Sequence, residues 1–155
     1  MVSFPGKEKI YMIGNFQKQF VDTNILVYAH DVTAGKKHIA AKKLLEELWS
    51  NQRGCLSTQV IQEFYVTITK KVALPVTPEF AASIIHDLSS WEIHKPDIED
   101  IINAIHIQKH HSISFWDALI VCSAASIHCD VIWSEDLNNG QYYEDIVLLN
   151  PLIES

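Results

Sequence analysis

The chain has 155 residues, of which 48% are hydrophobic and 20% charged, and this ordinary globular usage excludes the disordered and fibrous classes. A chain of this length builds one hydrophobic core, so we expect a single domain. The formal net charge of −7 is unusual for a protein that binds a polyanion, unless part of that charge lies in a site that cations neutralise.

Patterns typical of strands and of helices alternate along the first half of the chain. We expect, in order, a strand within residues 19–28, a helix over 36–50, a short strand at 55–56, a helix over 58–72 and a helix over 78–89. Ser57 or Thr58 is a suitable N-cap for the second of these helices. Thr77 followed by Pro78 favours the start of the third, because proline fits the first helical position.

The alternation continues through the second half. We expect a strand at 91–94, a helix over 97–110, a helix over 115–128 capped by Ser114, a strand at 131–133, a loop at 135–141 and a last strand at 146–149. This order predicts an α/β domain with a mainly parallel sheet between helical layers. Ligand sites in such folds lie at the carboxyl ends of the strands.

The cysteine count and the apolar runs bear on location. Cys55, Cys122 and Cys129 lie in apolar segments without the spacing of a metal site, which predicts reduced thiols rather than disulfides. No apolar run reaches the roughly 18 residues needed to span a bilayer, and the first residues lack the apolar region of a signal peptide. We therefore expect a cytoplasmic protein without a membrane segment.

Four acidic residues stand apart from the rest. Most of the 19 acids lie in clusters or in the first turns of helices, where water or the helix dipole accounts for them. Asp22, Glu63 and Asp117 are instead isolated in apolar segments, at the end of one strand and near the starts of two helices. Asp136 follows the strand at 131–133. Because the carboxyl ends of parallel strands share one edge, we expect these acids to converge.

Each acid also has an ordinary structural explanation. Asp22 can cap the turn after its strand, Glu63 can point into solvent, and Asp117 suits a helix N-terminus. Convergence of all four is harder to explain structurally, because two unit charges about 4 Å apart repel by about 4 kcal/mol at an effective dielectric of about 20. A fold keeps such a cluster where cations occupy it. Ligands that are all oxygen favour Mg²⁺ or Mn²⁺.

Four segments resemble, in order, the motifs of PIN domains, most closely those of the VapC-like toxins of type II toxin–antitoxin pairs. The segments are FVDTNILVY at 20–28, STQVIQEF at 57–64, SFWDALI at 114–120 and SEDLNNG at 134–140. The resemblance implies a PIN-like fold, with a central, mainly parallel sheet flanked by helices on both faces. The domain would span residues 19–150, preceded by an extension over 1–18 and followed by a tail over 151–155.

The resemblance also implies an activity: Mg²⁺- or Mn²⁺-dependent hydrolysis of RNA. The catalytic, metal-binding acids would be Asp22, Glu63, Asp117 and Asp136. Asn24 and Ser134 would orient these acids or the attacking water. Asp136 is preferred to its neighbour Glu135, because the family's acid stands two residues after the Ser/Thr. The implied partners are RNA, a small antitoxin protein and a second copy of the chain in a homodimer.

Three further features of the sequence have alternative interpretations: a pair of lysines, a pair of histidines and the first acidic motif. Lys36 and Lys37 begin a basic helix face that is typical of solvated surface, but beside a nuclease site they are predicted to contact RNA. His106 and His110 have the spacing of a zinc ligand pair, although no further ligand is obviously placed and a solvated helix end explains them. An aspartyl-nucleophile phosphatase needs a second Asp where Asn24 stands. The main alternative is a PIN-like module that binds RNA or protein without cutting it.

Overall fold

The computed structural model describes residues 16–153. Most of the expected extension and the end of the expected tail lie outside this range. The elements, in order, are β1 (Gln19–Val21), α2 (Thr23–His30), the 3-10 helix η1 (Val32–Ala34), α3 (Lys36–Asn51), β2 (Gly54–Ser57), α4 (Thr58–Lys70), α5 (Pro78–Leu88), β3 (Glu92–His94), α6 (Ile98–His111), α7 (Phe115–Ser126), β4 (Val131–Trp133), β5 (Tyr142–Tyr143) and β6 (Ile146–Leu149).

One sheet organises the fold, with strand order β3-β2-β1-β4-β6-β5. Every neighbouring pair is parallel except β5 with β6. The first strand of the chain therefore lies inside the sheet, where Phe20 is in register with Cys55 of β2 and Ile132 of β4. The mainly parallel α/β sheet expected from the sequence is confirmed.

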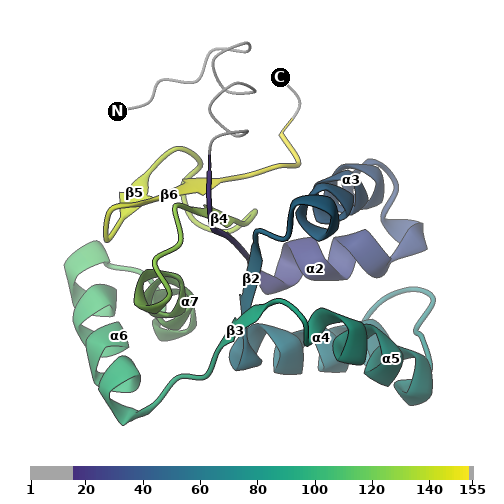
Figure 1. Cartoon of the computed structure of the whole chain (residues 1–155), viewed down its shortest axis with the longest axis horizontal. Helices are drawn as coiled ribbons and strands as arrows, with labels where there is room; N and C mark the ends of the chain where they lie inside the picture. Colours follow the sequence, from purple (N-terminus) through teal and green to yellow (C-terminus); the bar gives the residue numbers. More distant parts are fainter. Residues whose placement is uncertain (1–15, 154–155) are drawn as a thin grey trace.

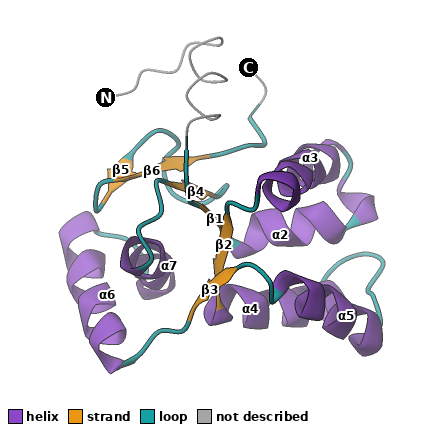
Figure 2. Ribbon diagram, in the orientation of Figure 1, coloured by secondary structure: helices purple, strands orange, loops and turns teal. Residues whose placement is uncertain are grey.

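Helices cover both faces of the sheet. Helices α6 and α7 pack on one side of the central strands, and α2, α3, α4 and α5 lie on the other (Figures 1 and 2). Helix α7 is buried from Ala118 to Ala124, so it needs no polar stripe, and its sequence is accordingly apolar on every side. Helix α3 is amphipathic and buries Leu44, Leu45 and Leu48. Among residues 16–153, no helix is long and apolar enough to cross a membrane.

Close packing and free thiols complete the core. A Cβ at Gly54 would lie 2.4 Å from the ring of Trp91, so β2 needs glycine where this ring covers it. All three cysteines are buried and none is in a disulfide in the structure, and their reduced state stays a prediction.

The helix starts follow the predicted caps. The hydroxyls of Ser57, Thr77 and Ser114 accept hydrogen bonds from backbone N–H groups in the first turns of α4, α5 and α7. Two segments differ from the sequence prediction. The strand expected within residues 19–28 ends at Val21, and α2, which was not predicted, begins at Thr23 after its N-cap Asp22. Strand β5 was not predicted either.

Candidate active site at the carboxyl edge of the sheet

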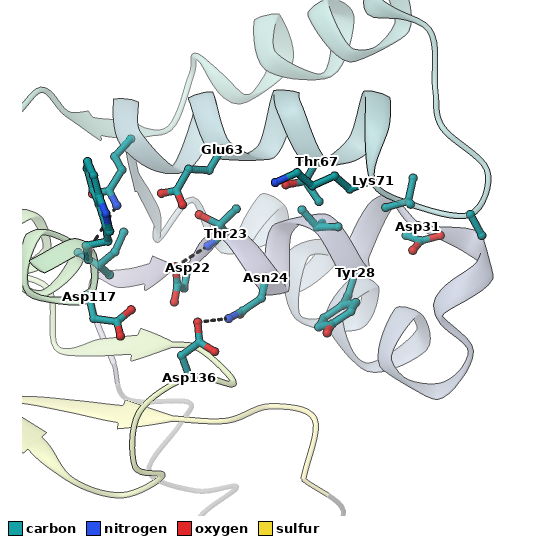
Figure 3. Close-up of a pocket in the computed structure, with 16 residues that line it drawn as sticks. Asp22, Thr23, Asn24, Tyr28, Asp31, Glu63, Thr67, Lys71, Asp117 and Asp136 are labelled. Atoms are coloured by element: carbon teal, nitrogen blue, oxygen red, sulfur yellow. Dashed lines mark hydrogen bonds between the residues drawn. The ribbon is translucent and has the colours of Figure 1, made fainter. Parts of the chain in front are cut away.

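A pocket of about 470 Å³ opens where β1 and β4 end. Helices α2 and α4 form two of its walls, and the start of α7 and the segment after β4 close one end (Figure 3). It is lined by Asp22, Thr23, Asn24, Val27, Tyr28, Asp31, Gln59, Glu63, Thr67, Lys71, Val72, Ala73, Trp116, Asp117, Ile120 and Asp136.

The four acids singled out in the sequence all line this pocket. Asp22 follows β1 and caps α2, Glu63 lies on α4, Asp117 is in the first turn of α7, and Asp136 lies after β4. Figure 3 shows their side chains around one end of the pocket. Because β1 and β4 are parallel neighbours, residues that are far apart in the sequence reach the same edge.

Asp22 is the buried member of the group, with 7% of its surface exposed. Its Oδ1 accepts the backbone N–H of Thr23 at 2.7 Å, and its Oδ2 accepts the hydroxyl of Ser134 at 2.7 Å. Burial, together with the smaller effect of the nearby charges of Asp136 and Asp117, raises the pKa of Asp22 to about 7, although the two hydrogen bonds lower it. The folded chain thus holds this carboxylate in a site that disfavours its negative charge.

Asn24 and Ser134 connect the segments that carry the acids. The Asn24 amide donates to Asp136 Oδ2 at 3.0 Å, and Ser134 Oγ accepts the backbone N–H of Asp136 at 3.0 Å. Burial raises the pKa of Asp136, as do the charges of Asp117 and Glu135, while Asn24 lowers it. Both residues predicted to orient the acids therefore contact them.

Glu135 and the predicted basic contacts lie outside the pocket lining. Glu135 accepts a hydrogen bond from the hydroxyl of Tyr28 and forms an ion pair with Lys37 at 3.0 Å. The Lys37 ammonium also lies 5.0 Å from the centre of the Tyr28 ring. Lys36 is exposed at the start of α3. Of the two adjacent acids that follow Ser134, Asp136 is the one that lines the pocket.

Sequence reasoning missed a row of pocket residues on α4. Gln59, Thr67 and Lys71 line the pocket together with Glu63, and the four are spaced four residues apart, so they share one helix face. This spacing is visible in the sequence once Glu63 is placed.

Two buried side-chain oxygens among the described residues lack a hydrogen-bond partner, and both belong to pocket residues: Thr23 Oγ1 and Gln59 Oε1. Such atoms are costly to leave unpaired.

The donors around the pocket are oxygens, as Mg²⁺ and Mn²⁺ prefer. Within residues 16–153, no group of three or more His, Cys, Asp or Glu side chains is arranged to hold a metal ion directly. Mg²⁺ usually keeps several water ligands and binds through one or two carboxylates together with substrate phosphate. The donor set therefore fits a hydrated ion, which needs fewer direct protein ligands.

His106 and His110 line a separate pocket between α6 and α7, together with Cys122 and Glu144. His111, the next residue, pairs with Glu144 at 3.0 Å. This part of the described chain likewise forms no metal-binding group.

Comparisons with known proteins agree with the fold. A model of the PIN domain family matches residues 20–143. A sarcin–ricin loop cleaving VapC toxin of Mycobacterium tuberculosis is 17% identical, with a TM-score of 0.61, covering 77% of this chain and 92% of that one. A toxin–antitoxin complex from Klebsiella pneumoniae contains a chain that is 19% identical, with a TM-score of 0.63, covering 86% and 98%.

A DNA-bound VapBC complex from Salmonella typhimurium gives 18% identity and a TM-score of 0.61, also covering 86% and 98%. The comparison with curated proteins found no match.

Proposed function

The chain belongs to the PIN domain family, and from that premise we propose that it is a divalent-metal-dependent endoribonuclease. The observation that carries the proposal is the pocket at the carboxyl edge of the sheet, which is lined by carboxylates from four separate segments. Asp22 supports it most directly, because its buried carboxylate lies beside two further acids and, among the described residues, has no oppositely charged partner, which a bound cation would supply.

Asp22, Glu63, Asp117 and Asp136 are the residues that would hold Mg²⁺ or Mn²⁺. When bound, the metal supplies an activated water for in-line attack on a phosphodiester and stabilises the charge that develops on the phosphate. The chain itself positions the reactants. Ser134 fixes the orientation of Asp22, and Asn24 fixes that of Asp136. No side chain is required to form a covalent intermediate.

The proposed biological role is that of the toxin in a type II toxin–antitoxin pair. It is supported by the fold shared with a VapC toxin and with chains of toxin–antitoxin complexes. RNA is the proposed substrate, since one of these relatives is described as cleaving the sarcin–ricin loop. Lys36 and Lys37 remain proposed RNA contacts. For Lys37, RNA must compete with the ion pair to Glu135.

A small antitoxin is the proposed protein partner, with an Arg or Lys among the pocket carboxylates as its recognition element. We also propose a homodimer in the cytoplasm. The proposed contact surface is helix α5, on which Phe80 is exposed.

RNA cleavage tests the proposal. The wild-type protein is incubated with a mixed RNA pool in Mn²⁺, in Mg²⁺ and in EDTA, and new 5′ ends are mapped. Asp117→Asn is compared with Glu79→Gln, which also removes an acid from the first turn of a helix but lies outside the pocket. We expect Asp117→Asn to lose about a thousandfold in rate, because several kcal/mol of transition-state stabilisation depends on the metal.

Glu79→Gln is expected to cut like wild type. An equal loss of rate in both variants would mean that Asp117 only stabilises the N-terminus of its helix and does not bind the metal. Binding of RNA without cleavage in any metal would favour the alternative, a PIN-like binding module.

A further inference from the structure

The pocket extends well beyond the four acids. It continues between α2 and α4 to the ends of these helices, where Tyr28 and Asp31 line one wall and Thr67 and Lys71 the other. Figure 3 shows Asp117 at one end of this space and Lys71 toward the other. From Glu63 to Lys71 the wall follows α4 for a little over two turns, which corresponds to about 12 Å along the helix axis.

Lys71 supplies the positive charge in this pocket, since none of the other described residues that line it is a lysine or arginine. The residue is exposed, and its backbone N–H caps α4 by donating to the carbonyl of Thr67. Its ammonium forms no ion pair or hydrogen bond with another residue in the 16–153 range. Lys37 differs, because Glu135 neutralises it.

We propose that Lys71 forms a phosphate subsite, in which its ammonium binds a backbone phosphate of single-stranded RNA along the strand from the phosphate held at the carboxylates. The inference rests on the proposed ribonuclease function. The Lys71 side chain lies beside Thr67, about one turn along α4 from Glu63, which assigns it to the phosphate next to the one beside Glu63 (Figure 3). The strand then lies in the pocket between α2 and α4.

Charge explains why the subsite matters. The chain carries a formal net charge of −7, and the acids at the other end of the pocket repel RNA until a metal neutralises them. Asp31 lies at the same end as Lys71 and opposes phosphate binding there. Its Oδ1, however, already accepts hydrogen bonds from the backbone N–H and the hydroxyl of Thr33. The Lys71 ammonium therefore supplies the positive charge at an end of the pocket where the RNA would otherwise meet only the negative charge of Asp31.

A purely structural role for Lys71 is the ordinary alternative, because a cation at a helix C-terminus interacts favourably with the helix dipole. Lys70 provides the matched control. It is the last residue of the same helix and is also exposed, but it does not line the pocket. A helix-end role affects both lysines alike, whereas a phosphate subsite depends on Lys71 alone.

RNA binding separates the two roles. Binding of a fluorescent single-stranded oligouridylate is measured by anisotropy in Mg²⁺ from 50 to 200 mM salt, with Asp22→Asn in every protein to prevent cleavage. We expect Lys71→Gln to reduce the slope of log affinity against log salt by about 0.7, the contribution of one phosphate contact on a single strand. Its affinity deficit then shrinks by about 2.6-fold between the two salt concentrations.

Lys71→Arg is expected to keep the parental slope, since arginine also binds phosphate, and Lys70→Gln to leave it unchanged. Parental RNA binding by Lys71→Gln, or equal deficits in both glutamine variants, would overturn the subsite. Wild-type protein that neither binds nor cuts RNA would instead overturn the proposed function, so the two failures are distinguishable.

Discussion

Two carboxylates in different parts of the fold, Asp22 directly after β1 and Asp100 on α6, have similar hydrogen bonds and different neighbours. Asp22 caps α2 and accepts hydrogen bonds from Thr23 and Ser134. Asp100 belongs to the capping box of α6 and accepts hydrogen bonds from the Asp97 backbone and the Ser126 hydroxyl. Each carboxylate therefore uses both of its oxygens.

The surrounding charges separate the two sites. Asp100 pairs with His94 at 3.2 Å, and although burial opposes it, the Asp97 N–H, His94 and Ser126 lower the pKa of Asp100. Asp22 has no such partner among the described residues, and burial with two neighbouring acids raises its pKa. Satisfied hydrogen bonds thus do not identify a structural carboxylate. Like charges around a buried acid are the better sign of a site prepared for a cation.

The largest contrast is expected in RNA cleavage. Asp22→Asn should reduce the rate about a thousandfold or more, because it removes a metal-binding charge. Asp100→Asn, the same chemical change outside the pocket, should cut at the wild-type rate at temperatures where it is folded. Comparable losses of cleavage rate in the two variants would contradict the proposal that Asp22, but not Asp100, binds the metal.

The pH dependence of stability should have opposite signs at the two sites. In EDTA the folded pKa of Asp22 is about 7 against an ordinary 3.8, so the folded state binds the proton more tightly and stability falls as pH rises through this window. The loss is on the order of 4 kcal/mol. Asp22→Asn should remove it and make the metal-free variant more stable than wild type at pH 8.

For Asp100 the folded pKa is lowered, so its contribution is present above about pH 4 and is lost as pH falls through the folded pKa. Urea titrations between pH 3 and 8 of wild type and both asparagine variants measure these differences. Parallel curves for wild type and Asp22→Asn would contradict the assigned charge state.

A smaller effect is expected from the histidine that pairs with Asp100. His94 also contacts the buried hydroxyl of Ser123 at 2.9 Å, joining β3 to α7. His94→Ala should cost about 1–3 kcal/mol in unfolding free energy, because it leaves buried polar partners unpaired. His86→Ala, at an exposed position near the end of α5, should cost much less in the same denaturation experiment.

The smallest effects distinguish two serines. Ser134→Ala should weaken Mn²⁺ binding about tenfold, because it removes the hydroxyl that orients Asp22. Ser126→Ala removes the corresponding hydroxyl from Asp100 and should cost about 1 kcal/mol of stability without changing Mn²⁺ affinity. Thermal melting against Mn²⁺ concentration reports both values. A shifted Mn²⁺ midpoint in Ser126→Ala would contradict the separation of the two sites.

The sequence predicted most of the fold because most helices carry caps and a regular apolar period. Helix α2 was missed since TNILVYAH buries residues on several sides and shows no polar face. Strand β5 was missed for a different reason. The turn between β5 and β6 places Glu144 and Asp145 at positive φ, and these residues lack the Asn-Gly signature of such turns.

The candidate site was predictable in part. The isolation of Asp22, Glu63 and Asp117 in apolar segments marked them, and parallel strand order indicated their common edge. Lys71 gave no comparable signal, because an exposed lysine at a helix end is ordinary until the pocket wall is known. The preference for Asp136 over Glu135 came from the motif spacing, and the structure adds that Asp136 lines the pocket while Glu135 pairs with Lys37.

The position of β4 beside β1 determines when the site can exist during synthesis. Asp22 is synthesised early in translation, but Ser134 and Asp136 follow 112 residues after their partners Asp22 and Asn24. Translation adds about 5–20 residues per second, so a nascent chain spends most of its synthesis without a complete pocket. The site is therefore completed only as the last part of the chain emerges from the ribosome, so the proposed nuclease would be inactive during most of its own synthesis.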